Sequence, residues 1–207
     1  RFQVDKHSRQ VAFDGEILDY QEYYYYLLNK PRGVVTTTSD EKGRKTVLDL
    51  LEDIDQRVYP VGRLDYDTTG ALLLTNDGTI ANQLMHPKSR VDKIYLAKVS
   101  GIATVEKLAP LKQGVIIKGR KTAPARVTIE RVDKDKKTSM VRIIIHEGRN
   151  HQVKDMLQKV GLPVDKLTRE QYAFFDLIGL QSGEYRKLTG VEVKRLKAQD
   201  YKNYRRK

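Results

Sequence analysis

The sequence contains no cysteine and no long apolar run, and each absence excludes a class of protein. Without cysteine the chain cannot form disulfides, use a thiolate nucleophile or bind zinc through sulfur. No stretch approaches the roughly 18 consecutive apolar residues of a transmembrane helix, and no charged segment followed by an apolar one resembles a secretion signal. We therefore expect a cytoplasmic protein that does not bind membranes.

The charge of the chain is strongly positive. Its 207 residues include 39 Lys and Arg against 27 Asp and Glu, which gives a net charge of +12. Such an excess favours a polyanionic partner, most often nucleic acid. Positions 186–207 hold nine basic and two acidic residues, among them the candidate RNA contacts Lys194, Arg195 and Lys197. This segment is either a solvated tail or an arm that neutralises phosphates, and composition does not separate the two.

Apolar patterning predicts more strands than helices. We expect strands at 23–28, 34–37, 71–75, 94–99, 115–117 and 164–167, and hairpins at 11–18 and between 127–132 and 140–145. Short helices are predicted at 46–51, 77–85, 105–111, 150–160 and 191–198. This pattern indicates an α+β fold with a largely antiparallel sheet.

Two segments resemble metal sites, and both fail on spacing. Segment 65–70 begins like a calcium loop, but Asn76 stands where that loop needs a bidentate Glu. His146 and His151 are five residues apart, whereas the helical zinc motif needs four. The chain also has no glycine-rich phosphate-binding motif. We expect neither a metal nor a cofactor.

Asp65 is the strongest candidate for chemistry. An aspartate in a loop is usually a turn residue that bonds its own backbone. Here, however, it lies between Gly62 and Gly70, and the apolar run 71–75 follows directly. A loop anchored on a buried strand is rigid enough to carry a functional site.

The motif around Asp65 resembles that of a known family. Residues Gly62-Arg63-Leu64-Asp65, with the segment 67–78 that follows, closely resemble the catalytic motif of ribosomal RNA pseudouridine synthases of the RsuA/RluB type. Three further segments agree with this family in order and spacing: Tyr26-Leu27-Leu28-Asn29-Lys30-Pro31-Arg32-Gly33, Lys93-Ile94-Tyr95 and Glu147-Gly148-Arg149-Asn150-His151-Gln152-Val153-Lys154. The match extends from about residue 10 to residue 198.

The resemblance implies a fold and a set of site residues. It implies a mixed, mainly antiparallel sheet with peripheral helices and a basic central cleft, and a reaction without metal or cofactor. Asp65 would be the single catalytic carboxylate, Tyr95 would lie against the target base, and Lys154 would pair with Asp65. Further candidate RNA contacts are Arg63, Lys93 and Arg149.

The implied reaction is the isomerisation of uridine to pseudouridine. The enzyme breaks the bond from the sugar to a base nitrogen, rotates the base and rejoins it through a carbon, for which an ionised carboxylate is needed. A base inside folded RNA must first be unstacked, so we expect a ribosomal RNA stem-loop with a flipped uridine as partner. Segment 169–174 favours large-subunit over small-subunit RNA. A pre-ribosomal particle is a further expected partner, and the protein is expected to be a monomer.

The chain begins with Arg1 rather than Met, so residues 1–20 are interpreted as the remnant of an N-terminal RNA-binding module plus linker. Residues 21–198 would form the catalytic domain and 199–207 a basic tail.

Two alternative functions are a non-catalytic RNA-binding factor in ribosome assembly and a metal-dependent nuclease that uses Asp65 and Asp67. Two departures from the family pattern, His151 where Arg is common and Asp155 after Lys154, reduce the positive charge of the helix expected there.

Overall fold

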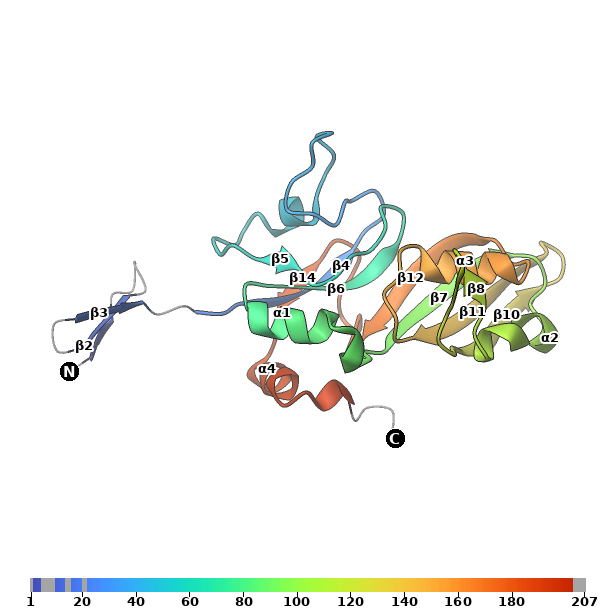
Figure 1. Ribbon diagram of the computed structural model, residues 1–207. Coiled ribbons are helices and arrows are strands. Elements are labelled where there is room, and N and C mark those ends of the chain that lie inside the picture. Colours follow the sequence, from blue (N-terminus) through green and yellow to red (C-terminus); the bar gives the residue numbers. More distant parts are fainter. Residues whose placement is uncertain (1, 5–9, 14–15, 20–21, 203–207) are drawn as a thin grey trace.

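The computed structural model describes residues 2–4, 10–13, 16–19 and 22–202. Its main element is a nine-stranded sheet in which β10, β11, β7, β12, β6, β4 and β14 follow one another, with β13 beside β12 and β5 beside β6 (Figure 1). The strands are β4 (Tyr25–Lys30), β5 (Tyr59–Pro60), β6 (Thr69–Thr75), β7 (Lys93–Ser100), β10 (Arg126–Asp133), β11 (Thr138–Ile145), β12 (Val164–Tyr172), β13 (Phe175–Asp176) and β14 (Tyr185–Lys187). Within this sheet only β12 and β6 pair in parallel, which confirms the predicted α+β class with a mainly antiparallel sheet.

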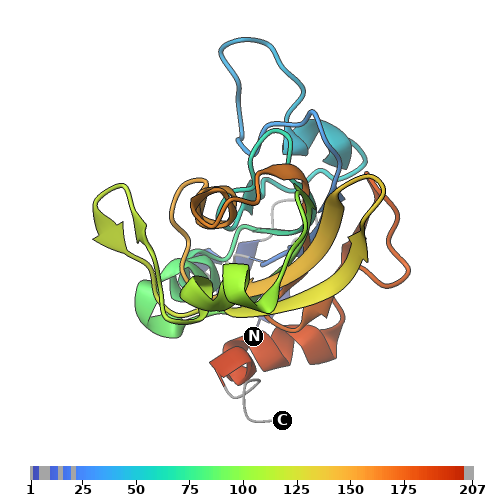
Figure 2. The same ribbon diagram turned by 90° about the vertical axis from the view of Figure 1, so that its right-hand side faces the viewer.

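The helices cover the two faces of this sheet. They are α1 (Gly78–Met85), α2 (Val105–Leu108), α3 (Gln152–Lys159) and α4 (Gly190–Lys197), with 3-10 turns η1 (Val47–Leu51), η2 (Pro87–Ser89), η3 (Ala109–Lys112) and η4 (Asp200–Lys202). Helix α3 lies on one side of the sheet, whereas α4 lies on the other (Figures 1 and 2). Among the described residues, no helix is long and apolar enough to cross a membrane.

Two small sheets complete the fold. Strands β8 (Ile116–Ile117) and β9 (Arg120–Lys121) form a hairpin that projects from the body of the protein (Figure 2). Near the N-terminus, β1 (Phe2–Val4), β2 (Gln10–Phe13) and β3 (Glu16–Asp19) form a sheet of their own. The pairing of β2 with β3 agrees with the predicted hairpin, whose turn at positions 14 and 15 lies outside the described residues.

The core is layered on both faces of the central strands. Tyr25 and Leu27 of β4 pack in a buried cluster with α1 and α4, whereas Tyr26 and Leu28 pack in another with η1. A third cluster joins β7 and β11 to α3. Strands that are buried on both faces read as continuous apolar runs rather than as alternating ones, which explains the sequence of β4.

The close approach of β6 and β12 fixes where the loop before β6 ends. Gly70 has φ +118°, and a Cβ atom there would lie 2.1 Å from the backbone oxygen of Arg169. Only glycine fits a position that combines this backbone conformation with so close a neighbour. The two strands pair through Thr69 with Thr168 and Gly70 with Arg169, so the loop that carries Asp65 is anchored at its end.

Several predicted boundaries were wrong. Segment 34–37 is not a strand, because it makes only a single bridge, between Val35 and Thr46. Helix α3 begins at Gln152 rather than 150, since His151 has the left-handed conformation with φ +53°. Strand β12 continues to Tyr172, well beyond the predicted end at residue 167. Its polar second half gave no apolar signal, yet it is paired on both sides by other strands.

Candidate active site

The backbone of the loop that carries Asp65 is held by hydrogen bonds on both sides of this residue. The hydroxyl of Thr36 donates to the oxygen of Leu64 at 2.8 Å and accepts from its N–H at 3.2 Å. On the other side, the N–H of Gly33 donates to the oxygen of Tyr66 at 2.9 Å. These bonds flank Asp65, so its carboxylate projects from a fixed backbone.

Two side chains from the start of α3 meet this carboxylate. His151 Nδ1 lies 3.0 Å from Asp65 Oδ2, and Lys154 Nζ lies 3.4 Å from the same oxygen. Lys154 also makes a shorter contact of 2.6 Å to Asp67 Oδ1. The Asp65 side chain is 28% exposed. The structure thus brings Asp65 and Lys154 together, but Lys154 is shared between two carboxylates.

The charges of Lys154 and Asp67 stabilise one another. Burial opposes the charged form of Lys154, but its hydrogen bond to Asp67 and the negative charges of Asp65 and Asp67 raise its pKa above the ordinary value. In return, the hydrogen bond from Lys154 lowers the pKa of Asp67. Lys154 therefore stays cationic and Asp67 anionic at neutral pH.

A buried lysine lies behind the loop. Lys30, at the end of β4, has no exposed surface, and its Nζ donates to the oxygens of Pro31 at 2.9 Å and Tyr66 at 3.3 Å. Burial lowers the pKa of Lys30 to about 8, while the charges of Asp67 and Asp65 oppose this shift. Lys30 thus ties the turn after β4 to the loop after Asp65 and adds positive charge behind it.

Tyr95 lies on β7 and is buried at 9% exposure. Its backbone pairs with Arg169 of β12, which in turn pairs with Gly70 of β6. The buried Arg169 donates from Nε to the oxygen of Ala71 at 2.8 Å. Tyr95 therefore lies on a strand that only β12 separates from β6, the strand that follows the Asp65 loop.

The segment before α3 is a network of hydrogen bonds. Gln152 Oε1 accepts from the N–H of Arg149 at 3.2 Å, and its Nε2 donates to Glu147 Oε1 at 3.0 Å. Lys93 Nζ donates to the Glu147 backbone oxygen at 3.1 Å. Burial, reinforced by the charge of Arg169, lowers the pKa of Lys93 to about 8. Lys93 is thus a structural partner of this segment.

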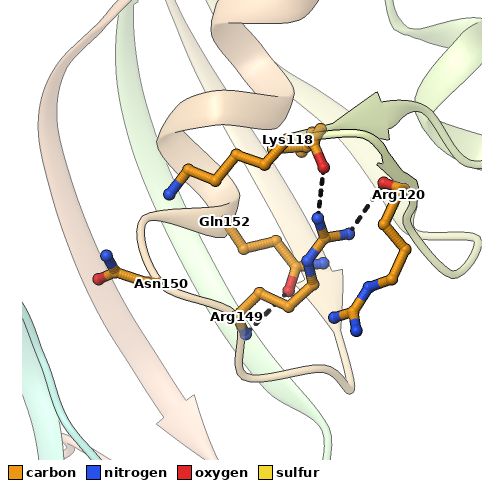
Figure 3. Close-up of a pocket in the computed structure, with 6 residues that line it drawn as sticks. Lys118, Arg120, Arg149, Asn150 and Gln152 are labelled. Carbon is orange, nitrogen blue, oxygen red and sulfur yellow. Dashed lines mark hydrogen bonds between the residues drawn. The ribbon is translucent and has the colours of Figure 1, made fainter.

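Arg149 joins the same segment to the β8–β9 hairpin. Its guanidinium donates to the backbone oxygens of Ile117 at 2.5 Å and Arg120 at 3.2 Å (Figure 3). These residues line a pocket of about 300 Å³ together with Lys118, Asn150 and Gln152. Arg149 therefore has a structural task besides any contact with RNA.

The remaining candidate RNA contacts are separated in space. Arg63 is exposed two residues before Asp65. Lys194, Arg195 and Lys197 lie on α4, across the sheet from α3 (Figure 1). Arg195 pairs with Asp200 at 2.7 Å, and its guanidinium lies 3.9 Å from the centre of the Phe174 ring. The α4 cations therefore do not face the Asp65 loop.

Asp155, one of the two departures noted in the sequence, forms an ion pair with the β8–β9 hairpin, where its carboxylate lies 3.7 Å from Lys118 Nζ.

Within the described ranges, no three metal-ligating side chains lie together. Lys154 instead bridges Asp65 and Asp67. This pair therefore lacks the further ligand that the nuclease hypothesis requires.

Sequence reasoning did not assign His151 and Lys30 to this site. His151 was noted only in a rejected zinc motif and as a departure from a family pattern, and Lys30 only as part of a segment that agrees with the family. Neither contact has a sequence signal of its own, because His151 meets a residue 86 positions away. A left-handed conformation is several-fold more common at histidine than at most residues, but only the structure shows where it occurs.

The chain matches the family model described as RNA pseudouridylate synthase over residues 24–159. It belongs to this family, which confirms the enzyme class expected from the motifs. It is 52% identical to the Bacillus subtilis ribosomal large subunit pseudouridine synthase B over 92% of this chain and 78% of the relative. An uncharacterized RNA pseudouridine synthase of Aquifex aeolicus is 39% identical over 90% of this chain and 74% of the relative.

Solved structures agree with this assignment. A crystal structure of a pseudouridylate synthase has a TM-score of 0.74 and 32% identity, and the match covers 90% of this chain and 80% of the other. The structure of an H/ACA ribonucleoprotein bound to a substrate RNA matches with a TM-score of 0.56 and 15% identity, over 72% of this chain and 47% of the other. The second likeness concerns the fold alone. The protein is thus a pseudouridine synthase with the fold of that enzyme class.

Proposed function

We propose that this protein converts uridine to pseudouridine in bacterial large-subunit ribosomal RNA, with Asp65 as the catalytic carboxylate. The observation that carries the proposal is the placement of Asp65 on a fixed loop, within 3.4 Å of both His151 and Lys154. The choice of large-subunit RNA is supported by the 52% identity to the Bacillus subtilis enzyme of that name.

The positive charge around the loop suits this reaction. A carboxylate that adds to the sugar or the base, or that removes a proton from the sugar, must be ionised. Lys154, with its Nζ 3.4 Å from Asp65 Oδ2, and Lys30 behind the loop place positive charge near this carboxylate. The isomerisation transfers no electrons and no group to another molecule, so the proposed mechanism uses the protein's own side chains.

Tyr95 is proposed to hold the uracil ring while it turns. It lies on the strand next to β12, which itself pairs with β6 directly after the Asp65 loop. An aromatic face holds a detached base by stacking, without a directional bond that would resist its rotation. Because Tyr95 is packed among β7, β11 and α3, its ring is held in place before the RNA binds.

The RNA is proposed to present the uridine flipped out of a stem-loop. Extrusion of a base requires a few kcal/mol, which contacts to the phosphate backbone supply. Arg63 is exposed beside Asp65, and Lys118 and Arg120 are exposed on the hairpin next to α3. We further propose that residues 1–20 and the basic segment 199–207 assist RNA binding outside the catalytic domain, and that the protein acts as a monomer.

The test is release of tritium from ribosomal RNA that carries tritium at uridine C5. The wild-type protein should release tritium from a large-subunit transcript, in the presence of chelator as well. Asp65→Asn should lower the rate by at least about 10⁴-fold and still bind RNA. Asp53→Asn, a change of an exposed aspartate outside the site, should leave the rate unchanged.

Three results would contradict the proposal. Full turnover by Asp65→Asn would remove Asp65 from the mechanism. RNA binding by the wild type without tritium release would favour the non-catalytic assembly factor. Release from small-subunit but not from large-subunit transcripts would overturn the substrate assignment alone.

A further inference from the structure

We propose that His151 is a positioning residue for Asp65, whose Nδ1–H holds the carboxylate in its reactive orientation. This inference rests on the proposed catalytic role of Asp65. It concerns a side chain for which no role at this site was expected from the sequence.

The first observation is the distance. His151 Nδ1 lies 3.0 Å from Asp65 Oδ2, closer than Lys154 Nζ at 3.4 Å. The shortest contact of Lys154 is the 2.6 Å bond to Asp67. An ionised carboxylate can only accept a hydrogen bond, so the Nδ1 of His151 must carry the proton between the two groups. The imidazole is therefore the donor that fixes the direction of the Asp65 carboxylate.

The second observation is the backbone of His151. It has φ +53° and ψ +26°, a left-handed conformation that is unfavourable for a residue with a side chain. The turn is held by paired bonds between Arg149 and Gln152, each of 3.2 Å, and by the 2.9 Å bond from the N–H of Asp155 to the oxygen of His151. Strained backbone that its surroundings enforce is typical of functional sites.

The experiment is single-turnover tritium release at pH 7.5, with RNA affinity measured in parallel, for the wild type and three histidine variants. His151→Ala should be about 10- to 100-fold slower than the wild type. His151→Asn should be close to the wild-type rate, because its amide Nδ2 occupies the place of Nδ1 and asparagine tolerates both the left-handed backbone and the position before a helix. His86→Asn, at an exposed histidine whose Nδ1 accepts from the N–H of Lys88, should behave as the wild type.

Specific outcomes would overturn the inference. His151→Ala that keeps the wild-type rate would show that the contact is an ordinary surface ion pair. His151→Asn as slow as His151→Ala would show that the donor is not what matters. A loss of RNA affinity by the same factor as the rate would place His151 in binding. Asp65→Asn, measured in parallel, separates the two proposals: if it is fully active, the proposed function fails, and if it is inactive while His151→Ala is normal, only this inference fails.

Discussion

Lys154 Nζ lies 2.6 Å from Asp67 Oδ1 but 3.4 Å from Asp65 Oδ2. The lysine that the family motif pairs with Asp65 is thus held mainly by the second carboxylate of the loop. Asp67 keeps the Lys154 amine beside the loop, and the amine lies closer to Asp67 than to Asp65. The division gives different roles to two aspartates that look equivalent in the sequence.

The first prediction compares the loss of Asp67 with the loss of Lys154, the two partners of the 2.6 Å contact. Asp67→Asn should lower single-turnover tritium release by no more than about 10-fold, since Lys154 can move to Asp65. Lys154→Met should lower it by at least about 10²-fold, because two neighbouring carboxylates then lose the cation that lies between them. Equal losses in the two variants at pH 7.5 would contradict this division.

The second prediction concerns the contact between β6 and β12. Gly70→Ala should lower the free energy of unfolding by about 3–5 kcal/mol, because the new Cβ would overlap the oxygen of Arg169 and force the strands apart. Gly43→Ala is the matched control, with φ +70° and no heavy atom within 4 Å of the new Cβ. It should cost only about 1–2 kcal/mol. Urea denaturation measures both values, and similar losses would mean that strand contact is unimportant.

The third prediction is a pH dependence of stability that comes from Lys30. Its pKa is about 8 in the folded protein, against 10.5 ordinarily. Between these values the unfolded chain binds the proton more strongly, so the contribution of Lys30 to stability rises with pH; below pH 8 the cost of its buried charge is fully present. The difference in unfolding free energy between wild type and Lys30→Met should rise from pH 8 to pH 10 by at most about 3 kcal/mol. A difference that is constant with pH, measured by urea denaturation, would show that Lys30 is not desolvated.

The fourth prediction concerns Arg149. Arg149→Met removes the donors to Ile117 and Arg120, so amide hydrogen exchange in the β8–β9 hairpin should accelerate about 10-fold or more. Arg120→Met is the control, because it removes an exposed side chain and leaves the accepting backbone oxygen in place. Unchanged protection in the hairpin of Arg149→Met would mean that these bonds do not hold it.

Much of the fold followed from local patterns. The continuous apolar run of β4, the paired runs of β10 and β11, and the segment before Met85 each specified an element. The prediction of a strand at 34–37 was wrong, because its β-branched residues suit a strand but the segment makes only one bridge, between Val35 and Thr46. The end of β12 was missed, because its pairing rather than its composition makes it a strand.

The sequence alone determined the class of fold, the positive charge and the loop with Asp65, because each depends on residue types at short spacing. It did not determine which groups meet that carboxylate. His151 and Asp65 are 86 positions apart and meet only because α3 packs beside the loop before β6. Tertiary structure likewise decided that Arg149 holds a hairpin and that the α4 cations lie across the sheet. Contacts between distant segments depend on strand order and helix packing, which short-range patterns do not encode.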